Sequence, residues 1–200
     1  MTLAVMRKVR ITAVFLTGLL LFGAASAQTE SARGAARVRE HDAQKSAEAA
    51  NPDPAKEFYA ATSAAPKALK DGNFDLAEAL AADLLKQAEQ WEKNWNYGNA
   101  IHIGNLVLGH VALERGKIDD AKAFLLKAGK TPGSPQLNSF GPNMKLAGEL
   151  LAKGEKQVVL DYLQLIKAFW LPEHAKADKW KPTIESGSVP DFGANLKYGF

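Results

Sequence analysis

The chain has 200 residues, 25 of them basic and 22 acidic, and no cysteine, which excludes disulfides, thiolate catalysis and cysteine-bound metals. Three of the basic residues lie among the first 27 positions, so the remaining 173 residues carry 22 basic and 22 acidic side chains. This balance gives no reason to expect nucleic acid or an anionic membrane as a partner.

Residues 1–27 have the pattern of a secretory signal peptide. Arg7, Lys8 and Arg10 precede an apolar run over 11–22, and Ala25-Ser26-Ala27 fits the small-residue rule for cleavage after Ala27. The run is shorter than the ~20 residues that span a bilayer, which favours cleavage over an uncleaved membrane anchor. We therefore expect a bacterial protein exported to the periplasm or beyond the cell, without stable membrane insertion after cleavage.

Residues 28–53 are rich in alanine and charged side chains, and Val38 is their only large aliphatic residue. Because such a segment cannot offset its ordering entropy by burial, it is predicted to be a flexible linker. Asp53 and Pro54 mark its end, as an N-cap and a first-turn proline of the next helix.

Apolar residues spaced three and four apart predict a helical domain over 54–170, and alternating strand patterns are absent from the sequence. Pro66 is expected to bend the first helix or to start a new one. Gly129 is expected to cap the fourth helix. The predicted helices run over about 55–70, 75–94, 95–115, 118–128, 143–153 and 155–170.

Two segments lack this period. Residues 129–142 contain three prolines and three glycines and are predicted to be largely non-helical. In the C-terminal segment 171–200, a short helix over 173–181 is expected either to end before Pro182 or to continue with Pro182 in its next turn, and the rest is expected to pack back on the domain.

Three glycines occupy equivalent turns between paired helices, because each follows one amphipathic helix and precedes another. Glycine provides the positive φ of such a turn, and small residues let paired helices approach closely. The turns contain Gly72, Gly116 and Gly154. Fixed positions after each glycine hold Ala77, Ala121 and Val159, then Ala81, Leu125 and Leu163, then Leu84, Ala128 and Ile166.

The second pair resembles a tetratricopeptide repeat at Leu108, Gly109, Ala112, Gly116, Ala121, Leu125 and Ala128. The resemblance covers about residues 55–170 and implies an all-α, right-handed superhelix of about three helix pairs with a concave face. Asn105 replaces the usual aromatic residue. The glycines are 44 and 38 residues apart, against ~34 in the standard repeat.

In that family, peptide-binding members often hold a carboxylate with Lys and Asn on the first helix of each pair. Here the inward positions are Thr62, Pro66, Leu106, His110, Met144 and Gly148. The resemblance therefore does not imply that function.

Two segments are candidate binding sites, and His102 and His110 on the third predicted helix are further candidate ligand- or partner-binding residues. Trp95 and Tyr97, with Trp91, form either a stacking platform for a peptide or sugar, or the packing of a helix joint. The loop 134–143 places Asn138, Ser139, Phe140 and Asn143 on a restricted backbone, which is either functional or a structural connection.

His102 and His110 lie eight residues apart on one helix face, about 12 Å along the axis, which is too far for one metal ion. Asp119 and Asp120 are better explained as a helix cap and a dipole partner than as a cation site. No nucleotide-binding or metalloprotease motif occurs. We therefore predict no catalytic residue, no metal and no cofactor. A hydrolase would require Asp or Glu at hydrogen-bond distance from His102 or His110 in a pocket.

Two functional hypotheses remain. The first is a non-catalytic, exported scaffold that mediates protein–protein interaction in the bacterial envelope through a protein or peptide partner. The alternative is a periplasmic protein that binds a small ligand with the Trp91–Tyr97 junction and the loop 134–143.

Overall fold

The computed structural model describes residues 32–43, 46, 53–170 and 176–198. The chain divides into two compact units, Met1–Asp53 and Pro54–Phe200. The predicted signal peptide and its cleavage after Ala27 lie outside the described residues. In the first unit, residues 32–43 are helical with every side chain exposed. The predicted linker is therefore helical there, and its alanine and arginine content favours a helix even without burial.

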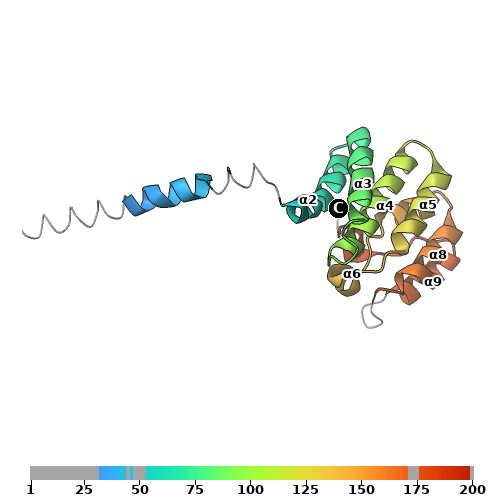
Figure 1. Cartoon of the computed structure of the whole chain (residues 1–200). Helices are drawn as coiled ribbons and strands as arrows, with labels where there is room; N and C mark the ends of the chain where they lie inside the picture. The colour runs from blue at the N-terminus through green and yellow to red at the C-terminus, as the bar shows by residue number, and fades with distance from the viewer. Residues whose placement is uncertain (1–31, 44–45, 47–52, 171–175, 199–200) are drawn as a thin grey trace, which may run out of the picture. The chain divides into compact units, whose positions relative to one another are not determined.

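The second unit is all-α, as predicted, and its described residues form no strand (Figure 1). Its elements are α2 (Pro54–Lys70), α3 (Phe74–Ala88), α4 (Tyr97–Glu114), α5 (Ile118–Gly129), α6 (Pro135–Phe140), α7 (Lys145–Ala152), α8 (Lys156–Ile166), α9 (Ala177–Glu185) and the 3₁₀ helix η1 (Gly193–Leu196). Within the described ranges, none of the helices combines the length and the apolar character that a membrane span requires.

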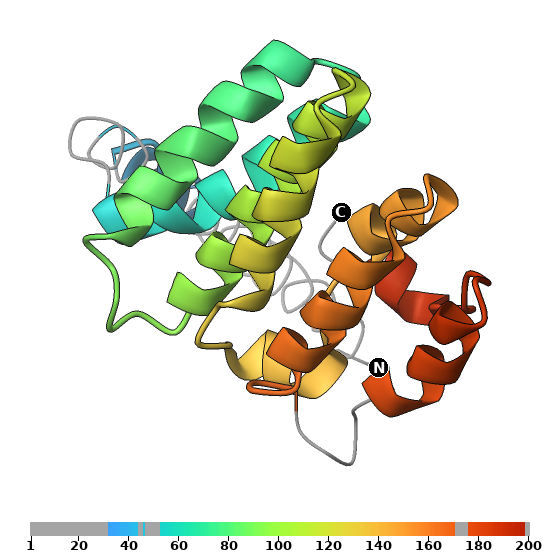
Figure 2. The same ribbon diagram turned by 90° about the vertical axis from the view of Figure 1, so that its right-hand side faces the viewer.

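Helices adjacent in sequence pack in pairs. Each pair is joined by a turn that contains a glycine with positive φ, as the sequence predicts. These are Gly72 (+75°) between α2 and α3, Gly116 (+73°) between α4 and α5, and Gly154 (+86°) between α7 and α8. Helix α4 packs against α2, α3 and α5, and α5 also contacts α7 and α8. Figures 1 and 2 show the resulting succession of helices from α2 to α9. This arrangement is consistent with a helical-repeat-like fold.

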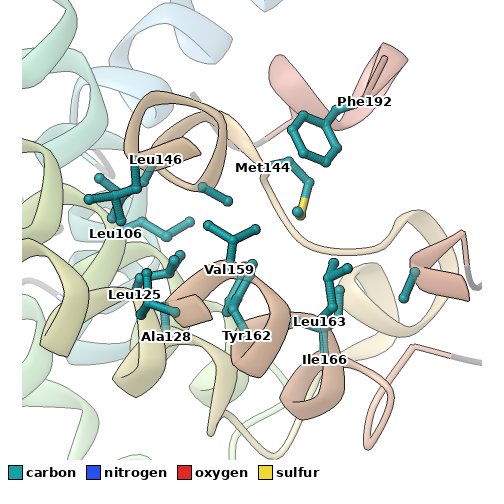
Figure 3. Close-up of a cluster of buried hydrophobic side chains, with 14 of the residues drawn as sticks. Leu106, Leu125, Ala128, Met144, Leu146, Val159, Tyr162, Leu163, Ile166 and Phe192 are labelled. Atoms are coloured by element: carbon teal, nitrogen blue, oxygen red, sulfur yellow. The ribbon is translucent and has the colours of Figure 1, made fainter. Parts of the chain in front are cut away.

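The residues at fixed positions after the three turn glycines build the core, because all nine are at most 1% exposed. Figure 3 shows the part of this core where Leu125 and Ala128 of α5 meet Val159 and Tyr162 of α8. Phe192, from the C-terminal segment, lies near Met144 in the same cluster.

Pro66 is buried inside a continuous α2, so the expectation that it starts a new helix is wrong. A proline leaves one carbonyl of the preceding turn without its helical hydrogen bond, and packing of the α2 core face holds the helix together. Helix α3 ends at Ala88 rather than near Asn94, because turns with bonds such as Trp91 N–H to the Ala88 carbonyl follow it.

Gly129 is not a positive-φ cap but the buried last residue of α5. A Cβ there would lie 2.8 Å from Cδ2 of Tyr162 and 3.0 Å from Cβ of Leu165. Glycine is thus used for the close approach of α5 to α8 rather than for turn geometry.

The prediction of a largely non-helical 129–142 segment is wrong for α6. Ser134 caps this helix by accepting a 3.0 Å hydrogen bond from Leu137 N–H, and Pro135 occupies its first turn. Helix α9 contains Pro182 and continues to Glu185, which agrees with the second of the two expectations for this proline, and Trp180 and Ile184 are buried on either side of it.

Candidate functional site

A pocket of about 470 Å³ lies between α2 and α4, and we call it the α2–α4 pocket. Its volume is within the range of small-molecule sites in proteins. Helix α6, the segment after it and the C-terminal segment complete its walls. The lining residues are Thr62, Ser63, Pro66, Lys67, Lys70, Asn96, Asn99, His102, Ile103, Leu137, Asn143 and Tyr198.

Helical periodicity explains which side chains reach the pocket. On α2, Thr62, Pro66 and Lys70 are four residues apart and therefore share one face. At the start of α4, Asn99 and Ile103 follow the same spacing. Because α2 packs directly against α4, these two faces meet.

An amide network fixes the side of the pocket nearest α6. Asn99 Nδ2 donates to Asn96 Oδ1 at 3.0 Å and to Gln136 Oε1 at 3.1 Å. Asn99 Oδ1 accepts from Ser134 Oγ at 2.6 Å, and this hydroxyl also caps α6. Each amide orientation is thus determined by its partners.

Asn96 has one donor that this network does not use. The residue is 4% exposed, and its Nδ2 has no hydrogen-bond acceptor among the described residues. A buried polar atom without a partner costs about 1–3 kcal/mol. Because the Nδ2 atom has less than 1 Å² of accessible surface, an acceptor on a ligand would remove this cost only if the Asn96 amide or the pocket wall shifted on binding.

His102 joins three segments beside the pocket. Its Nδ1–H donates to the Ala128 carbonyl at 3.1 Å, and Nε2 accepts from Asn143 N–H at 3.2 Å. Burial lowers the pKa of His102 to about 4, and the hydrogen bond to Ala128 only partly opposes this effect. Since both ring nitrogens bond to the backbone, His102 fixes the pocket wall as a neutral ring.

The C-terminal segment is attached to the segment that follows α6. Asn195 Nδ2 donates to the Phe140 and Pro142 carbonyls at 3.1 and 2.9 Å. Asn143 Nδ2 donates to the Tyr198 carbonyl at 2.6 Å. These bonds hold Tyr198 in the pocket wall, where partial burial raises the pKa of its phenol.

Lys67 and Lys70 are the charged residues of the lining, which includes no carboxylate among these described positions. Lys67 pairs with exposed Asp71, at 2.5 Å between Nζ and Oδ2. Lys70 makes no ion pair with the residues that the structure describes. The pocket mouth therefore carries one positive charge that its own lining does not balance.

Two of the candidates from the sequence, His102 and Asn143, line the pocket. Asn138 is partly buried against Gly133, whereas Ser139 is exposed on α6. Phe140 is 62% exposed, with its ring 5.3 Å from the ring of Tyr198.

The junction before α4 contains packed and exposed aromatic rings. Trp91 stacks on Phe58 with ring centroids 5.7 Å apart, and Tyr97 packs against the same small core. Trp95 remains 50% exposed beside Tyr59. Of the described residues 91–97 at this junction, Asn96 lines the pocket.

His110 lies outside the pocket and pairs with a carboxylate. It is 3% exposed, and its Nδ1 is 2.9 Å from Oε2 of half-buried Glu149. Burial acts to raise the pKa of Glu149, but the hydrogen bond from His110 and nearby positive charges outweigh it and lower the pKa. This pair meets the distance condition set for a hydrolase but not the pocket condition.

In the part of the chain that the structure describes, no three His, Asp or Glu residues are placed to hold a metal ion.

The sequence interpretation missed several lining residues. Asn96 and Asn99 are polar residues three positions apart at the start of an apolar helix, and this spacing could have indicated a shared polar face. No sequence pattern marks Lys70 or Tyr198 as lining residues, because nothing in the sequence shows which distant segment faces α2 or α4.

No protein-family model, curated protein or solved structure matches the chain.

Proposed function

We propose that the protein is a non-catalytic, exported protein that binds a small ligand in the α2–α4 pocket. One observation carries the proposal: a single pocket contains Asn96, whose Nδ2 has no acceptor, together with Leu137 and Asn143 of the loop 134–143. Export rests on the signal-peptide pattern of residues 1–27.

The pocket walls support this function because their hydrogen bonds are made before any ligand arrives. His102, Asn99 and Asn143 each bond to a partner on another segment. A preformed wall reduces the ordering entropy that binding would otherwise cost.

A thermal-shift screen of polar metabolites tests the proposal. A ligand at 100 times its Kd adds about 2.7 kcal/mol to the free energy of unfolding, which raises the Tm by roughly 5–10 °C for a domain of this size. Ser63→Trp fills the pocket from an exposed position and should abolish the shift. Ser139→Trp, an equally exposed position outside the lining, should preserve it. A screen without any shift, or a shift that survives in Ser63→Trp, would contradict the proposal.

A second function, a tetratricopeptide-repeat-like scaffold for a protein partner in the bacterial envelope, is favoured by another observation. Phe140 and Trp95 expose half or more of their surface, and aromatic residues are frequent anchors of interfaces. The paired helices and the resemblance at 108–128 support the same function. Under this proposal, Phe140→Ser and Trp95→Ser should each reduce partner capture from an envelope extract, whereas Ser63→Trp should not.

A further inference from the structure

We infer that the ligand of the α2–α4 pocket is a small organic carboxylate with an apolar body. This inference rests on the proposed function, since it specifies the chemical class that the same pocket takes. Charge, the unused donor of Asn96 and the apolar part of the lining support it separately.

The positive charge of the pocket lining favours an anionic ligand. Lys67 and Lys70 come from one face of α2, and the lining contributes no carboxylate among its described residues. Because Asp71 neutralises Lys67, one positive charge remains at the mouth. A single uncompensated charge suits a monoanion better than a phosphate monoester, which carries about −1.5 to −2 at pH 7.

The unused Nδ2–H donor of Asn96 favours a ligand that presents a hydrogen-bond acceptor. Asn96 Oδ1 is occupied by Asn99 Nδ2 at 3.0 Å, so the orientation of the Asn96 amide is set and its Nδ2 points away from that bond. This Nδ2 has no acceptor among the described residues and less than 1 Å² of accessible surface, although its residue lines the pocket, so a ligand oxygen reaches it only after a small shift of the pocket wall. A carboxylate oxygen is the stronger partner for such a donor, because a hydrogen bond to a charged group contributes about twice as much as a neutral one.

The apolar part of the lining suits a ligand with an apolar body. Pro66, Ile103 and Leu137 face the pocket from three different elements. His102 is a neutral ring whose nitrogens are both engaged with the backbone, so it offers the ligand neither a charge nor a spare donor. An apolar group beside the carboxylate can therefore pack against Pro66, Ile103 and Leu137.

Calorimetric titration with matched acids and amides tests the inference. The probes are phenylacetate and hexanoate, each compared with its primary amide, which has nearly the same shape but no charge. We expect each acid to bind at least roughly tenfold more tightly than its amide at low ionic strength, and this ratio to fall with added salt. Phenyl phosphate should bind less tightly than phenylacetate.

Two variants locate the carboxylate. Asn96→Asp keeps the oxygen that accepts from Asn99 and replaces the unused donor with a negative charge. It should weaken acid binding by roughly 100-fold and leave amide binding within about threefold. Lys70→Gln should weaken acid binding by about three- to tenfold, whereas Lys86→Gln, on an exposed position outside the pocket, should not change it.

The outcomes separate the inference from the proposed function. If acid and amide bind equally well and Ser63→Trp blocks both, the inference of a carboxylate ligand is wrong, whereas the proposal of a ligand-binding pocket still holds. Tighter binding of phenyl phosphate than of phenylacetate would also overturn the inference of a carboxylate ligand. Absence of binding by both acids up to about 10 mM would reject the inference, while the metabolite screen with Ser63→Trp judges the proposed function independently.

Discussion

At the scale of single residues, His102 shows how a buried polar side chain organises the pocket without joining its chemistry. Its two nitrogens connect α4 to the end of α5 and to Asn143 through the backbone. The sequence makes His102 a candidate binding residue on the third predicted helix. It could not show that both nitrogens are engaged, since the partners lie 26 and 41 residues away.

The lowered pKa of His102 predicts a specific dependence of stability on pH. The unfolded chain takes up a proton near the ordinary value of 6.5, whereas the folded chain does so only near 4. Since the unfolded state binds more protons between these values, the free energy of unfolding should fall as pH is lowered from 6.5 to 4. The loss from this group is about 3 kcal/mol in total, with no further contribution below pH 4 or above 6.5.

Urea denaturation at pH 7 and pH 5 measures this effect. His102→Asn retains a donor for the Ala128 carbonyl but cannot titrate. It should be less stable than the parent at pH 7 and should lose about 2 kcal/mol less than the parent on going to pH 5. An unchanged pH slope in His102→Asn would show that other groups account for the dependence.

At the scale of elements, Gly98 sets how closely α4 approaches the segment before α6, whereas Gly148 of α7 has no such role. A Cβ on Gly98 would lie 1.7 Å from the carbonyl oxygen of Gly133, and Gly133 is itself wedged against Asn138 and Phe169. A Cβ on Gly148 would lie 3.6 Å from the Phe192 ring, which is an ordinary contact. The two glycines are both helical, so they differ mainly in the space around them.

Gly98→Ala and Gly148→Ala should therefore change stability in opposite directions. The first should lower the free energy of unfolding by about 3 kcal/mol or more, because neither backbone can move away. The second should raise it by up to about 1 kcal/mol through helix propensity. Urea denaturation of both variants measures the difference, and a Gly98→Ala protein as stable as the parent would contradict the packing of α4 on the segment before α6.

The elements also show where sequence patterns are informative. The turns at Gly72, Gly116 and Gly154 were predicted because glycine between two amphipathic helices has one dominant structural explanation. Helix α6 was missed because its Ser134-Pro135 start stands among prolines and glycines that individually favour loops. The capping serine and first-turn proline were visible, but a six-residue helix has too few positions to show a period.

At the scale of the whole molecule, periodicity predicts the all-α pairing but not the pocket. Each pair repeats a local pattern, whereas the α2–α4 pocket combines side chains from α2, α4, α6 and both segments that Asn143 and Tyr198 occupy. Its assembly depends on long-range contacts such as the 2.6 Å hydrogen bond from Asn143 Nδ2 to the Tyr198 carbonyl. No spacing in the sequence encodes the meeting of residues that far apart.

The division into two units leads to a prediction about truncation. The core of Pro54–Phe200 begins at Phe58 and draws on residues through Phe192, while the described side chains of 32–43 are all exposed. A protein starting at Pro54 should therefore keep its Tm within about 4 °C of that of the full chain, because the described side chains of 32–43 that it lacks are exposed and the loss of the predicted cap at Asp53 costs about 1 kcal/mol. It should also give the same Tm increase with phenylacetate as the full chain, if that acid binds. Thermal unfolding followed by far-ultraviolet circular dichroism measures both values. A loss of more than about 5 °C would mean that residues 1–53 contribute to the stability of the second unit.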